Sequence, residues 1–490
     1  MSQRDLKEAF VSNLNGTSLG EVALGSFLAP VCVINRGLLL LLLHWASGTL
    51  PLPRPLLSHL LFDYSVLILP LVLSCTVLSD VLHLVVITLT LVPACVVWFI
   101  HRRSRRPSAV AAFLRSHVQF DQVPFVTVFR VFVNVKTAIS ILAVDFSVFP
   151  RRYAKTETYG TGVMDFGVGA FVFANALVCP EARGKTASGS KVKLISQQLM
   201  SVWPLVALGL GRVLSVKMTG YQEHVTEYGV HWNFFFTLAV VRVVSSVLLA
   251  VLPLNQSVVF ALLIGGIYQF ILETTGLKEF ILHNGNREVD FIHANKEGLF
   301  SVVGYVALYL VGVQVGLYVM QRRSSVQQWI QTLLNLLFGS FVLYAVLCIF
   351  QTFVEPVSRR LGNLSFCLWS VAQSLFFLSC LGLADMLLLF SKTLSGFHLL
   401  PSSWSLYQKQ SESVCDRRRH VDGLCLLQAV NRNQLLFFLI ANVMTGLTNS
   451  VVDTLSCGQL FSVCILLLYM FINCFIIYVL HVYGITVKFW

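Results

Sequence analysis

Long and uninterrupted runs of apolar residues dominate the chain. The runs are continuous, as in the leucines of 38–43, and do not alternate with polar residues as those of a half-buried strand would. A helix that spans a bilayer needs about 20 mostly apolar residues, so the pattern predicts about thirteen spanning helices. They lie near residues 21–45, 57–78, 81–101, 124–145, 160–180, 194–216, 231–253, 257–276, 299–320, 329–352, 364–391, 434–456 and 459–484.

The composition excludes a soluble domain. Hydrophobic residues make up 56% of the 490 residues and charged residues only 12%, whereas a soluble globular protein carries roughly 25% charged residues. Because no water reaches the bilayer core, the backbone must satisfy its own hydrogen bonds, and continuous apolar runs do so as helices. We therefore expect an all-α polytopic integral membrane protein, with tails at 1–20 and 485–490 and a single multi-spanning domain at 21–484.

The distribution of Lys and Arg predicts the orientation, because cytosolic loops carry an excess of both. The count places the N-terminus in the lumen and the C-terminus in the cytosol, with the basic loops 101–123, 181–193 and 392–433 on the cytosolic side. The glycosylation sequon that begins at Asn15 then lies in the lumen, where it can be used. Topology also accounts for most of the net charge of +12, so we expect no nucleic-acid partner.

Five polar segments interrupt the apolar pattern, and the predicted topology puts them all on the lumenal side. A charge at membrane depth is energetically expensive, so it indicates a functional site by default. The exception to the lumenal pattern is Arg36, a lone cation within the first predicted span. Together the segments predict one polar cavity in the lumenal half of a helical bundle. They are residues 143–157, 159–169, 220–233, 293–298 and 357–363.

The first segment combines a carboxylate with three cations. Asp145 stands where the fourth predicted span ends, and Arg151, Arg152 and Lys155 follow a proline. A carboxylate and an ammonium ten residues apart across such a turn can meet. A structural ion pair between two helices is the alternative, although three cations on the less basic side are more than topology requires.

The glycine-rich segment 159–169 allows two interpretations. Its glycines either cradle a phosphate or let helices pack closely. Packing is favoured, because the Gly-Lys-Ser/Thr ending of a phosphate-binding Walker loop is missing. Asp165 lies inside the predicted span and therefore needs a partner.

The segment 220–233 repeats polar side chains at helical spacing. Glu223 and Glu227 are one turn apart, and His224 precedes His231 by two turns. No standard metal-ligand spacing appears, so we expect no metal and instead a polar wall around a hydroxyl-rich substrate. The candidate substrate-binding residues of all five segments are Arg151, Arg152, Glu157, Asp165, Glu223, His224, Glu227, His231, Trp232, Asn233, Asn295, Lys296, Arg359, Arg360 and Asn363.

A carboxylate, a lysine and several arginines near lipid suit a substrate with an anionic head and an acyl tail. The chain has no GxSxG elbow, but an acyl transfer that needs only a base and an oxyanion stabiliser is compatible with these groups. A channel or transporter is the competing class, and composition does not separate the two. A histidine-dependent membrane acyltransferase is disfavoured, because His44, His83 and His481 lack polar neighbours in the predicted spans.

Several long strings resemble one known family, in the same order and at the same spacing. The family is that of the inositol acyltransferases of glycosylphosphatidylinositol assembly, the class W proteins, and the likeness is closest to its vertebrate-type members. Ser147 and His293 depart from the family pattern, which usually has proline and asparagine there. The strings are Lys7–Asn13, Ile141–Phe173, Gly220–Thr237, Ala294–Gly304 and Val357–Phe366.

The resemblance implies an enzyme of the endoplasmic-reticulum membrane. Such an enzyme transfers a fatty acyl group, typically palmitoyl, from acyl-CoA to the inositol 2-hydroxyl of glucosaminyl-phosphatidylinositol. Acyl-CoA is then a co-substrate, and no cofactor is expected. The resemblance also implies that Asp145 and Lys155 are catalytic. A lipid transporter or flippase of the same pathway is the alternative function.

Sidedness adds a further expectation. Acyl-CoA is held in the cytosol and its head is too polar to cross the bilayer, whereas the polar segments are predicted to face the lumen. A cavity through much of the membrane would reconcile the two. Arg36 and Asp165, as charges within spans, are expected to line or flank it.

Overall fold

The structure of the chain is a computed structural model that describes residues 10, 12–47, 55–104, 109–118, 123–184, 191–219, 225–283, 285, 287–396, 400, 404, 406 and 422–487. The regular elements of these residues are all helical. Those of the first half are α2 (Leu19–Ser47), α3 (Pro55–Asp63), α4 (Leu69–Ser74), α5 (Leu82–Ser104), α6 (Ala109–Leu114), α7 (Pro124–Ala143), α8 (Val163–Leu177), α9 (Lys191–Thr219), α10 (Val225–Tyr228) and α11 (Phe234–Val251). Those of the second half are α12 (Ser257–Thr274), α13 (Leu277–Leu282), α14 (Phe291–Ala294), α15 (Lys296–Val319), α16 (Val326–Phe353), α17 (Leu364–Ser395), α19 (Leu426–Arg432), α20 (Gln434–Val451) and α21 (Gln459–Val482). Short π or 3-10 turns complete them, η1 (Tyr64–Ile68), η2 (Ser79–Val81), η3 (Arg151–Tyr153) and η4 (Leu254–Gln256).

Twelve helical segments of the described chain are long and apolar enough to cross a membrane. This finding confirms the predicted polytopic all-α class. The remaining predicted span, 160–180, is α8, a helix of 15 residues. At 1.5 Å per residue α8 is about 22 Å long, shorter than a hydrocarbon core of roughly 30 Å. The predicted number of thirteen therefore counted one helix that is too short to cross the core by itself.

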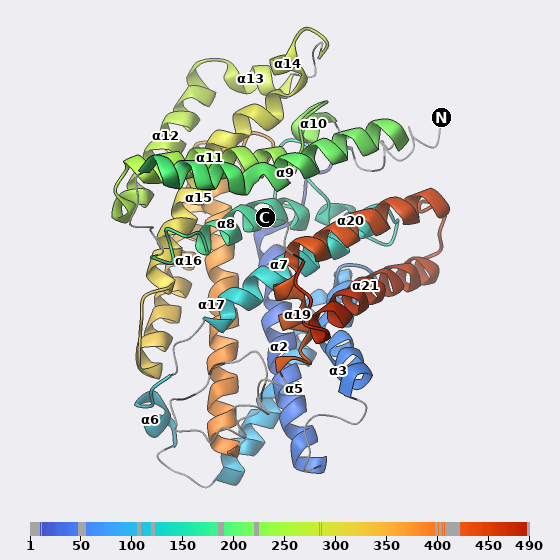
Figure 1. Ribbon diagram of the computed structural model, residues 1–490, viewed down its shortest axis with the longest axis vertical. Coiled ribbons are helices and arrows are strands. Elements are labelled where there is room, and N and C mark those ends of the chain that lie inside the picture. The colour runs from blue at the N-terminus through green and yellow to red at the C-terminus, as the bar shows by residue number, and fades with distance from the viewer. Residues whose placement is uncertain are drawn as a thin grey trace.

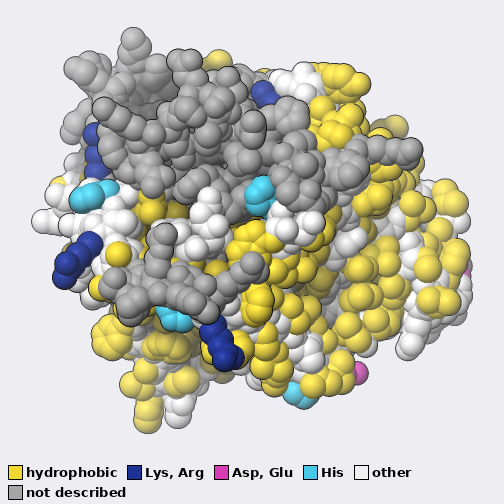
Figure 2. All heavy atoms as spheres, turned by 90° about the horizontal axis from the view of Figure 1, so that it is seen from below, with side chains coloured by type: hydrophobic (Ala, Val, Ile, Leu, Met, Phe, Trp, Pro, Cys, Tyr) yellow, Lys and Arg dark blue, Asp and Glu magenta, His cyan; other side chains and the backbone are white. Residues whose placement is uncertain are grey.

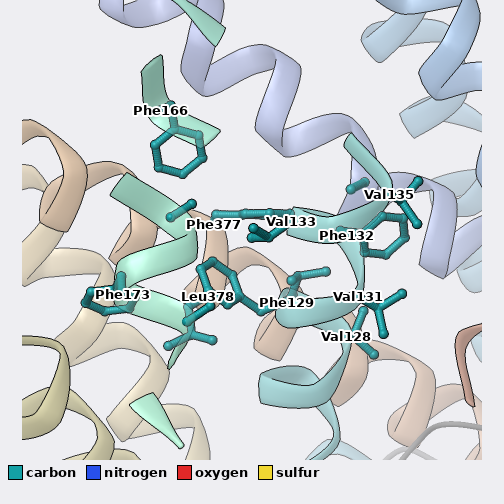
Figure 3. Close-up of a cluster of buried hydrophobic side chains, with 14 of the residues drawn as sticks. Val128, Phe129, Val131, Phe132, Val133, Val135, Phe166, Phe173, Phe377 and Leu378 are labelled. Atoms are coloured by element: carbon teal, nitrogen blue, oxygen red, sulfur yellow. The ribbon is translucent and has the colours of Figure 1, made fainter. Parts of the chain in front are cut away.

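Helix α17 is the central element of the bundle. It packs against α16, α2, α7 and α8, and Figure 1 shows it along the long axis of the molecule, with α9 and α20 crossing that direction. Its contact with α7 and α8 is filled by aromatic rings (Figure 3). The ring of Phe129 lies 5.3 Å from that of Phe377 and 6.2 Å from that of Phe173, centroid to centroid. The core of the molecule is thus built around α17.

The outer helices present apolar side chains outward, as a lipid-facing surface requires. Leu210 on α9, Leu262 on α12 and Phe338 on α16 are all more than half exposed. Figure 2 shows hydrophobic side chains over much of the described surface seen from below, with few charged ones among them.

Glycines bring α8 into close contact with its neighbours. A Cβ at Gly169 would lie 2.3 Å from the Ser370 hydroxyl of α17, and one at Gly316 would lie 2.6 Å from the carbonyl oxygen of Leu177. These contacts confirm at Gly169 that the glycine-rich segment serves helix packing. They also join the middle of α8 to the first two turns of α17, and the end of α8 to the last two turns of α15. The three helices therefore run in the same direction.

One end of the bundle collects the predicted polar segments, because α8, α15 and α17 all begin there. We call this end the polar end and define it as residues 144–165, 225–233, 269–283, 287–297, 355–363 and 449. Hydrogen bonds between side chains of these ranges, described below, hold them together.

A buried ion pair outside the polar end also holds a helix from the C-terminal part of the chain. Arg36 of α2 contacts Asp63 of α3 at 2.6 Å, and the two side chains are 3% and 0% exposed. The backbone N–H of Leu426, at the start of α19, also donates to Asp63, at 2.9 Å. Arg36, expected to line a path for the donor, thus has protein partners. Asn35 has one too, because its amide donates to the Leu89 carbonyl of α5 at 2.8 Å.

Removing one partner of this pair should destabilise the fold strongly. Asp63→Asn or Arg36→Gln leaves a charge buried without its counter-charge, which costs about 3–5 kcal/mol. The double variant Arg36→Met/Asp63→Leu buries no charge and should recover most of that stability. Thermal unfolding of the purified protein in detergent measures all three. A double variant as unstable as the single variants would contradict the assignment.

Candidate active site

Asp165 anchors the loop between α7 and α8. One oxygen of its carboxylate accepts hydrogen bonds from the backbone N–H groups of Thr156 and Gly162, at 3.0 and 3.1 Å. The other accepts from the Arg359 guanidinium at 2.7 Å. Asp165 was expected inside a span, but α8 begins at Val163, so it lies in the first helical turn. Its partner Arg359 comes from the segment before α17, so two of the predicted polar segments meet here.

The N-terminal tail pairs with the same loop. The carbonyl of Leu14 accepts from the N–H of Glu157 at 2.9 Å, and the N–H of Thr17 donates to the carbonyl of Thr161 at 2.7 Å. A Cβ at Gly160 would lie 2.1 Å from the Asn15 carbonyl, and its φ of +128° also requires glycine. The side chain of Asn15 is exposed. The sequon therefore belongs to the polar end.

Asp145 and Lys155 do not form the direct contact expected from their spacing. The Asp145 side chain accepts a hydrogen bond from the amide of Asn449, at the end of α20, at 2.7 Å. The Lys155 ammonium contacts Glu227 of α10 at 2.5 Å. Asp145 is 8% exposed, and the Lys155 and Glu227 side chains are 25% and 26% exposed. The two proposed catalytic groups are thus held by different helices.

The surroundings of Lys155 are rich in charge. Its ammonium lies 5.6 Å from the ring centroid of Tyr228, and the Arg359 guanidinium lies 5.7 Å from the same centroid. Burial and the neighbouring Arg359 lower the pKa of Lys155, although the Glu227 carboxylate opposes the shift. A lysine in this setting exchanges its proton more readily than an exposed one.

Arg151 and Arg152 both have protein partners. The guanidinium of Arg151 donates to the backbone carbonyls of Val144, Phe146 and Phe149 at 2.9–3.0 Å, and so gives these groups, which follow the end of α7, a hydrogen-bond partner. Burial lowers the pKa of Arg151 to about 10, and Asp145 opposes this. Arg152 pairs with Glu21 at the start of α2, at 3.0 Å, and with Asp80 of η2, at 2.7 Å. Both arginines contribute to structure, and their expected phosphate contacts stay a prediction.

The segment 220–233 is described from residue 225 onward, so Glu223 and His224 lie outside the described residues. His231 donates its backbone N–H to the Asn295 side chain at 2.8 Å. Trp232 donates to Thr237 at 2.9 Å. Asn233 caps α11 and also donates to the Gly209 carbonyl of α9 at 2.9 Å. These contacts are structural, and they fix the approach of α9 and α11.

The last two predicted segments interlock through buried ion pairs. Glu297 is 0% exposed and pairs with Arg287 at 2.6 Å and Arg360 at 2.9 Å. Arg360 also lies 3.8 Å from Glu157. The Lys296 ammonium donates to the carbonyls of Phe280 and His283.

The network around Glu355 completes the polar end. The carboxylate of Glu355 accepts from Tyr159 at 2.8 Å, Gln269 at 2.8 Å and Asn363 at 2.9 Å, and Asn363 also caps α17. Sequence reasoning missed Glu355 and Asn449, and it included Glu297 in the polar segment 293–298 without naming it as a candidate. Glu355 is a carboxylate directly before the predicted segment 357–363, and that signal could have identified it. Within the described residues, no group of three His, Cys, Asp or Glu side chains could hold a metal ion.

The fold and this end define a polytopic helical membrane protein with a buried, charged site at one end of its bundle. The family model GWT1 matches residues 3–480, so the chain belongs to the GWT1 family. It is 45% identical over 507 residues to the glucosaminyl-phosphatidylinositol-acyltransferase PIGW of Bos taurus, and 44% identical over 508 residues to that of Homo sapiens, with 100% of each chain covered. It is 32% identical over 533 residues to GPI-anchored wall transfer protein 1 of Debaryomyces hansenii, with 99% of each chain covered.

The contact between Gly304 of α15 and Gly362 should be essential for the site. A Cβ at position 304 would lie 1.8 Å from the Gly362 carbonyl oxygen, so Gly304→Ala must push residues 358–363 away. Such overpacking costs about 1–3 kcal/mol and should displace Arg359 from Asp165. We expect a lower melting temperature and a loss of activity. Gly266→Ala on α12, where a Cβ meets open space, is the control, and equal behaviour of both variants would contradict the expectation.

Proposed function

We propose that the chain is an acyl-CoA-dependent inositol O-acyltransferase of the endoplasmic-reticulum membrane. It moves a fatty acyl group, palmitoyl in the first instance, to the inositol 2-hydroxyl of glucosaminyl-phosphatidylinositol. The names of the relatives from Bos taurus and Homo sapiens, glucosaminyl-phosphatidylinositol-acyltransferases, support the acceptor and the type of reaction. The observation that carries the proposal is the pair of oppositely charged groups, Asp145 and Lys155, held at the polar end.

Asp145 acts as the general base. An alcohol is a very weak acid near neutral pH, so its attack on a carbonyl needs a proton acceptor within hydrogen-bond reach. The neutral amide of Asn449 holds the carboxylate of Asp145 in place through a hydrogen bond. The hydroxyl oxygen attacks the thioester carbonyl, a C–O bond forms and the C–S bond breaks. The hydroxyl proton passes through Asp145 to the departing thiolate, so the products are the acyl-inositol and free CoA.

Lys155 supplies positive charge to the developing oxyanion. Its contact with Glu227 positions the ammonium, so it does not orient Asp145 as its spacing had indicated. The contact is a quarter exposed, and the ammonium can therefore turn toward a bound carbonyl. Such positioned donors are among the largest contributions to acyl-transfer rates. No covalent acyl-enzyme is needed.

Asp145→Asn should lower turnover by about 10²–10⁴-fold, because general-base catalysis contributes that much. Asn449→Leu, which removes this hydrogen bond to the carboxylate, should lower turnover by a smaller factor. Asn442→Leu on the same helix is the control, because that amide bonds to the Phe438 carbonyl one turn earlier. The purified protein is given palmitoyl-CoA and glucosaminyl-phosphatidylinositol, and the acylated lipid is quantified by mass spectrometry. Near-normal turnover of Asp145→Asn would reject the base, and lipid transport without product would favour a flippase.

The polar end faces the lumen in this proposal. Two observations support this side, the smaller share of Lys and Arg in its loops and the sequon at Asn15, which is paired with the loop 157–161. The donor then enters from the cytosolic side and extends its thioester toward the polar end.

Cysteine labelling in sealed microsomes tests the side. Ser147 at the polar end and Ser324 at the opposite end are both exposed and are replaced singly by cysteine in a background without native thiols. An impermeant maleimide added outside should label Ser324→Cys and reach Ser147→Cys only after permeabilisation. Asn15→Gln should also abolish a glycosidase-sensitive mobility shift. Labelling of both cysteines from outside would place the site in the cytosol.

A further inference from the structure

The hydroxyl of Tyr228 is buried without a hydrogen-bond partner among the described residues. Tyr228 ends α10 and is only 8% exposed. Its ring lies 5.6 Å from the Lys155 ammonium and 5.7 Å from the Arg359 guanidinium. A buried hydroxyl normally has a partner, and an orphaned one in a native structure calls for an explanation. A ligand that accepts its hydrogen bond is one such explanation.

The charge of Arg212 on α9 acts on both Tyr228 and Lys155. Arg212 belongs to the apolar span Leu199–Met218 of α9, is exposed and makes no ion pair with another described residue. The Asn233 amide bonds to the Gly209 carbonyl at 2.9 Å, so α9 is fixed against the start of α11, one helical turn from Arg212. Burial raises the pKa of Tyr228 and lowers that of Lys155, and after Arg359 the charge of Arg212 lowers both. The positive charge of Arg212 therefore acts on groups of the site.

We propose that Arg212 and Tyr228 form the subsite for the phosphodiester of the inositol lipid. The inference rests on the proposed function and names which residues recognise the acceptor. The phosphate accepts hydrogen bonds from the guanidinium and from the Tyr228 hydroxyl, which suits the planar donor fork of arginine. Neither residue was among the candidates taken from the sequence. Lys155, whose ammonium lies 5.6 Å from the centroid of the Tyr228 ring, is left for the reacting carbonyl.

The position of Arg212 favours a lipid phosphate over the phosphates of the acyl donor. Arg212 is itself exposed within the apolar span Leu199–Met218 of α9. Arg212 lies six residues before Met218, about 9 Å along the helix from that end of the span. A lipid that diffuses in the membrane plane reaches this cation from the side. A water-soluble CoA head approaches from a solvent-exposed end.

Three variants test the subsite. Tyr228→Phe removes a hydroxyl that has no protein partner to lose, so folding should be preserved. Arg212→Gln removes the charge, whereas Arg212→Lys keeps the charge but lacks the planar set of N–H donors of the guanidinium. Lys217→Gln on the same helix is the control, because Lys217 is also exposed. We expect Tyr228→Phe and Arg212→Gln to raise the KM for glucosaminyl-phosphatidylinositol about tenfold, as loss of a hydrogen bond to a charged group predicts. The KM for palmitoyl-CoA should stay unchanged, and Arg212→Lys should show a smaller effect.

A binding measurement separates this inference from the proposed function. Glucosaminyl-phosphatidylinositol in nanodiscs should stabilise the wild-type protein against heat more than a neutral diacylglycerol does, and Arg212→Gln should lose the difference. If wild type makes no acylated product but shows this binding, the proposed reaction fails and the subsite stands. A raised KM for palmitoyl-CoA alone would assign the cation to the donor and overturn the inference. Unchanged KM values and binding in both variants would show that Arg212 only reaches the membrane interface, as flanking arginines do.

Discussion

The ion pair between Asp165 and Arg359 is the constraint on which the arrangement of the polar end depends. The two side chains are 0% and 2% exposed, so each charge must be compensated by the other and by nearby donors. Asp165 does this with both oxygens, because it also holds the N–H groups of Thr156 and Gly162. The loop that carries Lys155 is thereby fixed between the first turn of α8 and the segment that leads into α17.

Two further buried carboxylates at the polar end also collect several donors. Glu297 compensates Arg287 and Arg360, and Glu355 gathers donors from three segments, among them Tyr159 and Gln269. Buried polar networks of this kind are stabilising only when every member is satisfied, and they then specify one geometry. Helices packed by small residues and van der Waals contact alone would slide more easily. The networks thus give the apolar bundle a rigid rim on which reacting groups can be held.

Apolar run length predicted most of the spans, because a bilayer imposes a fixed length on every crossing helix. The convergence of the polar segments also followed from the sequence, since alternating crossings bring their loops to one end. The sequence did not predict which residue is the partner of each charged group. Spacing indicated a contact between Asp145 and Lys155, but Asn449, a lone amide in a distant apolar helix, holds the first of them. Such pairings depend on which helices are neighbours, and hydrophobic periodicity does not contain that information.

Exposure separates the ion pairs that build the polar end from the groups that can meet a substrate. The pairs of Asp165 with Arg359 and of Glu297 with Arg360 are closed, with side chains at most 2% exposed. The pair of Lys155 with Glu227 is about a quarter exposed on both sides. A closed pair cannot exchange partners without leaving a charge uncompensated, which costs several kcal/mol. An open pair can exchange, because water or a substrate oxygen replaces the lost contact. Lys155 is therefore a cation of this end that can exchange its partner for a substrate oxygen, as the proposed mechanism requires, and Glu227 holds it when no substrate is bound.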